Sequence, residues 1–243
     1  MQSWGLTDQG CVRAQNQDTY KMEQLDKNTL LCVVCDGMGG AKSGNVASAL
    51  AADVFVQEIK RSWTAGMTKE KCSQILQAAV KQANTTVFEQ SQQIKDFQGM
   101  GTTLVGVLIQ GKLATVVNVG DSRAYKIDRG GIRQITKDHS LVQMMVDRGE
   151  VTPEVARTYP GKNVITRAVG TEATVLTDVF QLEVAKEDGL LLCTDGLSNM
   201  MDDQEILFEV AHGVNKQGCC QRLLDIVKGR GAPDNVTSVL ILI

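Results

Sequence analysis

Two apolar segments that each end in Asp-Gly constrain this chain more than any other feature of its sequence. Residues 30–35 (Leu-Leu-Cys-Val-Val-Cys) are typical of a buried strand, and Asp36 and a glycine follow them directly. The same pattern returns in residues 189–198, where apolar residues precede Asp195 and a second glycine. A carboxylate at the end of a buried strand costs free energy unless something pairs with it. We therefore expect the fold to bring two distant carboxylates together around a hard cation.

The spacing of apolar residues and turns predicts an α+β fold. Strands are expected at residues 4–12, 20–25, 30–35, 101–108, 113–119, 124–128, 132–135, 163–169, 178–184, 189–194 and 236–243. Helices are expected at residues 45–61, 68–92, 141–148, 203–211 and 219–229. Because most neighbouring strands are linked by hairpin-like turns, the sheets should be antiparallel. The expected solution is a four-layer α/β/β/α sandwich, with two central antiparallel sheets flanked by helices, in a single domain over residues 1–243.

The composition is that of a globular protein with an ordinary core. Hydrophobic residues make up 43% of the chain, and a net charge of −3 argues against nucleic-acid binding or a polybasic membrane patch. No apolar run approaches the roughly 20 residues of a membrane-spanning helix, and the first residues lack the features of a signal peptide. Seven cysteines, mostly in apolar runs, indicate a reducing compartment. We expect a cytoplasmic monomer with no nucleic-acid or membrane partner.

Four carboxylates each lie in a predicted loop or at a strand end: Asp18, Asp36, Asp195 and Asp234. Asp also favours turns for local reasons, so any one of them alone would be interpreted as a turn residue. Gathered together, the four would repel one another without a divalent cation. Oxygen ligands with no His or Cys at zinc spacing suit Mg²⁺ or Mn²⁺. Arg13 is either a surface cation or a guanidinium that grips a phosphate beside the metal.

Three further residues have alternative interpretations. Cys32 and Cys35 have the spacing of a thiol motif, but residues three apart on a strand face opposite sides. One metal ion cannot bind both thiols, so core packing is favoured. His139 follows an aspartate and precedes a serine. It could orient a loop or take part in the chemistry, and its position alone leaves both open.

Seven short motifs occur in order along nearly the whole chain. They are Arg13-x-x-Asn16-Gln17-Asp18, Asp36-Gly37-Met38-Gly39-Gly40, Gly101-Thr102-Thr103, Gly120-Asp121-Ser122-Arg123, Asp138-His139-Ser140, Thr194-Asp195-Gly196-Leu197 and Asp234-Asn235-Val236-Thr237. Together they resemble the metal-dependent protein serine/threonine phosphatases, the PPM or type-2C family, in their compact bacterial form. A single Asp-Gly-x-Gly-Gly motif would be weak, whereas seven motifs in order are specific.

The resemblance implies a cluster of two Mn²⁺ or Mg²⁺ ions in a cleft at one end of the sandwich, with a third, looser ion in many bacterial relatives. The implied metal ligands are Asp18 (through bound water), Asp36 (bridging two ions), Gly37 (through its carbonyl), Asp121, Asp195 and Asp234. Arg13 would bind the substrate phosphate, and Arg13, Asp36 and Asp195 would carry the catalysis. Residues from about 141 to 165 would form a flap beside the cleft that affects substrate choice.

The implied activity is hydrolysis of phosphoserine and phosphothreonine in proteins, by a hydroxide that bridges two metal ions. The implied partners are phosphorylated proteins and a bacterial Ser/Thr kinase whose action the enzyme opposes. Two alternatives stay open. One is a catalytically weak or silent relative that binds phosphoproteins, which stoichiometric capture of a phosphopeptide would favour. The other is a small-molecule phosphohydrolase, which turnover of sugar phosphates alone would favour.

Two positions depart from the family pattern. Bacterial relatives commonly place His directly after Asp-Gly-Met-Gly-Gly, where this chain has Ala41, and eukaryotic relatives place His at the position of Met38. A metal-bound water or His139 would then have to protonate the leaving oxygen. We expect alkyl phosphoesters to lose more rate than aryl ones, because a phenolate leaves with less help. If Ala41→His left the turnover of a phosphoserine peptide unchanged, this hypothesis would be wrong.

Overall fold

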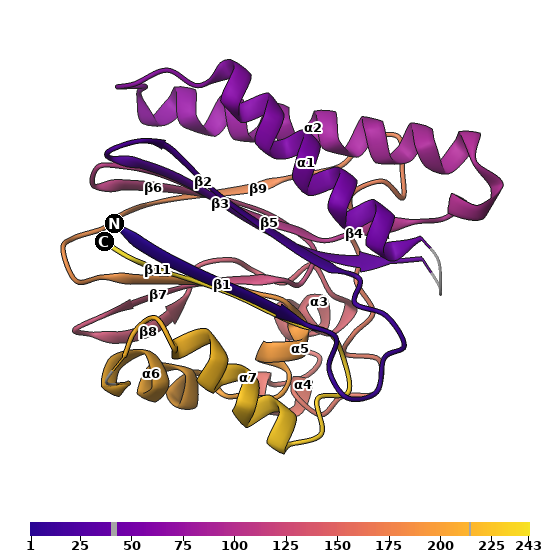
Figure 1. The fold of residues 1–243 in the computed structure, drawn as a ribbon. Helices are drawn as coiled ribbons and strands as arrows, with labels where there is room; N and C mark the ends of the chain where they lie inside the picture. The colour runs from indigo at the N-terminus through magenta and orange to yellow at the C-terminus, as the bar shows by residue number, and fades with distance from the viewer. Residues whose placement is uncertain (40–42, 214) are drawn as a thin grey trace.

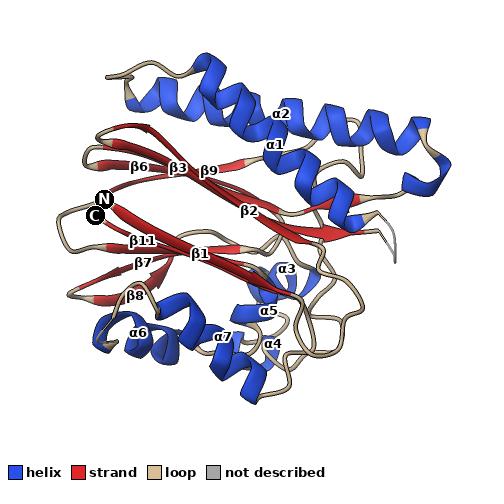
Figure 2. Ribbon diagram, in the orientation of Figure 1, coloured by secondary structure: helices blue, strands red, loops and turns tan. Residues whose placement is uncertain are grey.

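Two antiparallel sheets lie face to face, and helices cover the outer face of each (Figures 1 and 2). The structure is a computed structural model that describes residues 1–39, 43–213 and 215–243. The predicted α/β/β/α sandwich is therefore confirmed, while the hypothesis about Ala41 falls outside the described residues. Within those residues, no helix has the length and apolar character needed to cross a membrane.

The first sheet contains the strand that carries Asp36. Its strands, in spatial order, are β2 (Asp18–Asp26), β3 (Thr29–Met38), β5 (Leu104–Gln110), β6 (Leu113–Val119) and β9 (Asp178–Glu183), with the short β4 (Gly101–Thr102) paired to the end of β3. Alternate residues of β3 face different layers. Cys35 packs toward the covering helices, whereas Cys32 packs between the sheets. The two thiols thus face opposite sides, as the strand pattern predicts.

Two long helices, α1 (Gly44–Ser62) and α2 (Lys69–Gln93), cover the outer face of this sheet (Figure 1). The small side chains of Ala47 and Ala51 are fully buried against it, which lets α1 pack closely. The hydroxyl of Thr68 accepts a hydrogen bond from a first-turn N–H and fixes the start of α2. A 3₁₀ turn, η2 (Lys95–Phe97), follows.

The second sheet contains the strands that flank Asp195 and Asp234. Its strands, in spatial order, are β1 (Gln2–Asp8), β11 (Val236–Leu242), β10 (Gly189–Cys193), β7 (Arg123–Asp128) and β8 (Gly131–Gln134). The helices α6 (Asp203–His212) and α7 (Cys219–Gly229) cover its outer face. A capping box between Asp202 and Glu205 starts α6.

Three short helices lie near one end of the sandwich: α3 (Leu141–Asp147), α4 (Pro153–Ala156) and α5 (Asp195–Ser198). One sequence prediction is wrong here. The strand predicted at 163–169 is reduced to isolated bridges at Ile165 and Val169, because the residues between them bind other segments: Arg167 donates to Asp178, and the N–H of Thr166 donates to the carbonyl of His139. β10 ends at Cys193, one residue before its predicted end, and Asp195 opens a helical turn, where free backbone N–H groups favour a carboxylate.

Candidate metal centre

A cavity of about 560 Å³ opens at the end of the sandwich where β3 meets the segments before β11 and after β10. It is lined by six of the seven predicted site residues: Arg13, Asp36, Gly37, Asp121, Asp195 and Asp234. The seventh, Asp18, lies behind the cavity wall and is buried. Sequence positions more than 200 residues apart thus meet in one place, as the motifs predict.

Asp36 projects from a rigidly held backbone. Its N–H donates to the hydroxyl of Thr103 at 2.9 Å, and its carbonyl accepts from the hydroxyl of Thr102 at 2.8 Å. Asp18 is its direct neighbour across the β2–β3 pair. Burial raises the pKa of Asp36 well above its usual range, and the charges of Asp18 and Asp195 raise it further.

Asp18 is buried with half of its carboxylate unsatisfied. One oxygen, Oδ2, accepts hydrogen bonds from the hydroxyls of Thr194 and Thr237 at 2.9 and 2.7 Å. The other oxygen, Oδ1, has no hydrogen-bond partner in the described part of the chain. Burial raises the pKa of Asp18 to about 7, although the two hydroxyls oppose this shift. An orphaned, buried carboxylate oxygen is a place where a cation or its bound water would fit.

The two Asp-Gly pairs need glycine for the same reason. A Cβ atom on Gly37 would lie 2.1 Å from the carbonyl oxygen of Gly44, and one on Gly196 would lie 1.9 Å from that of Asn235. Both positions bring a second backbone segment against the residue that follows a site aspartate. The shared Asp-Gly pattern therefore reports close backbone packing beside each carboxylate.

The remaining carboxylates also repel one another. Burial, and then the charge of Asp234, raises the pKa of Asp195. Burial, and then the charge of Asp195, raises the pKa of Asp121 to about 8. The side-chain amide of Asn199 donates to Asp195 at 2.9 Å. This neutral donor and the charges of Arg123 and Arg13 do not offset the gathered negative charge, so this site favours either protons or added cations.

Arg13 is the one cation among the residues that line this cavity, within the described part of the chain. Its Nη2 donates to Oδ2 of Asp234 at 2.7 Å, and this hydrogen bond raises the pKa of the guanidinium. The Arg13 side chain is 56% exposed, against 28% for Asp234. It therefore lies at the mouth, where a guanidinium can meet an entering phosphate.

Several supporting residues were not assigned a role from the sequence. They are Thr103, Thr194, Asn199, Asn235 and Thr237. Asn235 is buried, and its amide donates to the carbonyls of Gln9 and Gln15, which holds the loop that carries Arg13. Four of the five stand inside the quoted motifs, within three places of a charged residue or a glycine of the same motif. Their position inside the motifs was the sequence signal that could have identified these four as supporting residues.

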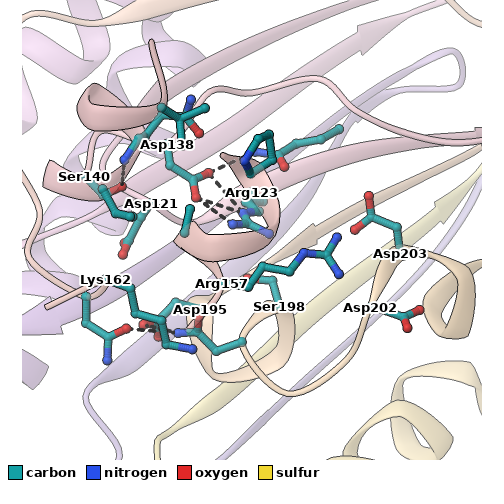
Figure 3. A pocket seen from close by; sticks show the side chains of 18 of the residues that line it. Asp121, Arg123, Asp138, Ser140, Arg157, Lys162, Asp195, Ser198, Asp202 and Asp203 are labelled. Carbon is teal, nitrogen blue, oxygen red and sulfur yellow. Dashed lines mark hydrogen bonds and ion pairs between the residues drawn. The ribbon is translucent and has the colours of Figure 1, made fainter. Parts of the chain in front are cut away.

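Figure 3 shows the residues around a second cavity, of about 410 Å³, which shares lining residues with the first. Asp121 and Asp195 line both cavities. One side of this cavity is formed by α3 and α4 of the predicted flap, and the other by the ends of β7 and β8 and the segment from α5 to the start of α6. His139 does not line either cavity and is buried behind them.

The carboxylates fit hard divalent cations. Among the described residues, no three Asp, Glu, His or Cys side chains already form a metal-binding group. The implied ligand set does not need three such side chains around one ion, because a backbone carbonyl and bound waters commonly complete the coordination of Mg²⁺ or Mn²⁺. The orphaned Oδ1 of Asp18 and the raised pKa values both mark negative charge that is left uncompensated. The chemistry of an all-oxygen donor set agrees with these two metals.

Known proteins resemble this chain over nearly its whole length. Residues 12–227 match the family model of protein phosphatase 2C. The serine/threonine phosphatase stp of Listeria monocytogenes serotype 4b (strain F2365) is 34% identical over 235 residues, which cover 97% of this chain and 93% of that protein.

Two solved structures share the fold. The serine/threonine phosphatase Stp1 from Staphylococcus aureus has a TM-score of 0.93 and 34% identity, over 99% of this chain and 94% of that one. The catalytic domain of the serine/threonine protein phosphatase PstP, in complex with two manganese ions, has a TM-score of 0.85 and 34% identity, over 98% and 96% of the two chains. The chain belongs to the protein phosphatase 2C family, as its seven motifs predict.

Proposed function

We propose that this chain is a Mn²⁺- or Mg²⁺-dependent phosphatase of phosphoserine and phosphothreonine in proteins, and that residues 1–243 form one catalytic domain. The observation that carries the proposal is the meeting of Asp36, Asp195 and Asp234 in one cavity whose single lining cation among the described residues is Arg13. The names of the similar proteins and the two manganese ions of PstP support it.

Two ions would be held by Asp36, the carbonyl of Gly37, Asp195 and Asp234, and a third by Asp121 with Asp195. Asp18 would act through bound water, which its orphaned Oδ1 could accept. When bound, the ions would supply a hydroxide at neutral pH by lowering the pKa of a water between them, and positive charge beside the phosphate.

The remaining steps belong to the chain's own side chains. Arg13 would release Asp234 and bind two phosphate oxygens, which orients the phosphorus and offsets charge that grows in the transition state. Thr102 and Thr103 would keep Asp36 in place. Asn163 lines both cavities from the predicted flap at about 141–165, so the flap would contact the substrate peptide beside the phosphorylated residue.

Phosphoproteins modified by a bacterial Ser/Thr kinase would be the substrates, and the monomeric state and cytoplasmic location stay predictions. The test is phosphate release from a phosphothreonine peptide by the purified chain. We expect turnover with Mn²⁺ and none with EDTA. Turnover of sugar phosphates but not of the peptide would contradict the protein substrate. If the Mn²⁺-loaded protein captured the peptide without turnover, the proposal that this chain is an enzyme would be contradicted.

A further inference from the structure

We propose that His139 is a positioning residue that clamps Gly120, holds Asp121 at the edge of the metal centre, and ties that ligand to the base of the flap. The metal side of this inference rests on the proposed function, because Asp121 is a metal ligand only by the family resemblance. The clamp itself consists of contacts within the chain and involves no metal ion. It also assigns a role to the histidine whose sequence position left its function open.

Both backbone polar groups of Gly120 are bound by His139. The N–H of Gly120 donates to Nδ1 of the imidazole at 3.0 Å. The N–H of His139 donates to the carbonyl of Gly120 at 2.9 Å. The side chain of Asn118 adds a donor to the same carbonyl at 3.2 Å. All of these groups are buried, so losing one partner would leave a buried polar atom unsatisfied.

The imidazole is oriented from its far side. Because Nδ1 accepts the Gly120 N–H, the ring proton belongs on Nε2, which lies 3.1 Å from Oδ2 of Asp178. The Nη1 of Arg167 also lies 3.1 Å from Nε2, but it donates to the other oxygen of Asp178 at the shorter distance of 2.8 Å. Burial alone would raise the pKa of Asp178, but hydrogen bonds from His139 and Arg167 lower it. Asp178 therefore stays charged and holds the ring in the tautomer that the clamp needs.

The neighbours of His139 complete the arrangement. Asp138 binds Arg123 through Nε and Nη2, at distances of 2.7 to 3.1 Å. Gly120 and Arg123 bracket Asp121 in the sequence, so residues 138 and 139 fix both ends of the loop that carries this ligand. Figure 3 shows the bonded Asp138–Arg123 pair with Asp121 beside it. Asp121 is 9% exposed and lines both cavities.

The two ends of the flap meet at the same point. The carbonyl of His139 accepts the N–H of Thr166 at 2.8 Å, and the N–H of Leu141 donates to the carbonyl of Val164, also at 2.8 Å. Ser140 caps α3, the first helix of the flap. A shift of the flap base would therefore move His139, and a shift of His139 would move the Asp121 loop.

Asparagine and glutamine each place an amide group near one of the two ring nitrogens, so they test the contacts of Nδ1 and Nε2 separately. In His139→Asn the side-chain oxygen can occupy the place of Nδ1 and keep the acceptor for Gly120. In His139→Gln the amide reaches toward the place of Nε2 and Asp178 but leaves Gly120 without its acceptor. His139→Leu removes both contacts. The second histidine of the chain, exposed on α6, provides the matched control His212→Leu.

The first measurement is hydrogen exchange of the Gly120 amide in EDTA, which needs no metal and no substrate. The second is Mn²⁺ binding by calorimetry, with Mn²⁺ alone as the probe. We expect faster Gly120 exchange and a roughly 10- to 100-fold loss of affinity at the weakest Mn²⁺ site in His139→Gln and His139→Leu. His139→Asn should recover both properties to within a few-fold, and His212→Leu should match the wild type.

Equal Gly120 exchange in the wild type and in folded His139→Gln would overturn the clamp. Equal affinity of the weakest Mn²⁺ site in His139→Asn and His139→Gln would overturn the link to Asp121. If His139→Leu does not fold, the Asn and Gln pair still decides both points. A wild-type chain that binds Mn²⁺ but releases no phosphate would refute the proposed function and leave the clamp intact, so the two failures are distinguishable.

Discussion

Two groups of aspartates lie at the same end of the sandwich and are compensated in opposite ways. The metal-centre acids, Asp18, Asp36, Asp121, Asp195 and Asp234, gather around one cavity. Among the described residues, Arg13 is the single cation that lines this cavity, and it pairs with Asp234 alone of the five acids. The paired acids, Asp138 and Asp178, each bind an arginine within hydrogen-bond distance. The environment raises the pKa of Asp36 and lowers that of Asp178. We therefore propose that an aspartate is structural where the chain supplies its own cation, and binds metal where that cation has to be added.

The largest expected effect is on catalysis. Replacing Asp36 by Asn removes a carboxylate expected to bridge two ions, and the loss of several kcal/mol of charge stabilisation corresponds to a fall in turnover of about 10³-fold. Phosphate release from a phosphothreonine peptide measures it. The matched variant Asp138→Asn, of a paired acid, loosens only the loop that carries Asp121, so it should lose far less turnover than Asp36→Asn as long as it is folded. Similar losses in both variants would remove the distinction between the two groups.

The next effect is on stability, and its sign should differ between the groups. In EDTA, Asp138→Asn leaves Arg123 partly buried and without its charged partner, which should lower the free energy of unfolding by about 3 kcal/mol. Asp36→Asn removes one of several repelling carboxylates and should raise it. Urea unfolding of both variants checks this. A destabilised Asp36→Asn in EDTA would show that its carboxylate is already compensated in the metal-free chain.

Bound metal should supply the positive charge that the metal-centre acids lack, and so stabilise the folded state. A ligand that binds only the folded state at 100 times its Kd stabilises it by about 2.7 kcal/mol. We expect Mn²⁺ to raise the Tm of the wild type and of Asp138→Asn, and to leave that of Asp36→Asn much less changed. Thermal unfolding with and without Mn²⁺ measures the shift. An equal shift in all three proteins would place the ions elsewhere.

The smallest effect is the pH dependence of the metal-free chain. Asp18 and Asp121 have pKa values raised to about 7 and about 8, so the folded state binds more protons than the unfolded state between their ordinary pKa near 4 and these values. Their contribution to stability is full below pH 4 and is lost as the pH rises toward 8. In EDTA the Tm should thus be lower at pH 8 than at pH 6. Mn²⁺ should reduce this difference, and a Tm that rises with pH in EDTA would contradict it.

Periodicity and turns predicted the sandwich because the central strands of both sheets are apolar and short turns join β2 to β3, β5 to β6 and β7 to β8. β3 and β10 were found as buried runs without any tertiary information. The strand expected at 163–169 failed because tertiary contacts decide that segment. Arg167 turns to Asp178, and the N–H of Thr166 binds His139. No local sequence pattern predicts either of these partners.

The candidate site likewise has one part that local sequence patterns predicted and one part that only tertiary contacts determine. The positions of Asp36 and Asp195 after apolar runs pointed to carboxylates that would meet, and they line one cavity. The hydroxyls of Thr194 and Thr237 on Asp18 bridge segments that are distant in sequence. The clamp between His139 and Gly120 does the same across a 19-residue separation. Such contacts depend on register and side-chain direction, which a single sequence does not display.

The most direct test of the difference between the two groups of acids is Mn²⁺ binding by isothermal titration calorimetry. It compares the wild type, Asp36→Asn and Asp138→Asn under identical conditions. We predict at least two Mn²⁺ ions in the wild type and in Asp138→Asn, and loss of the tight sites in Asp36→Asn. Unchanged Mn²⁺ binding in folded Asp36→Asn would contradict the assignment of this cavity as the metal centre.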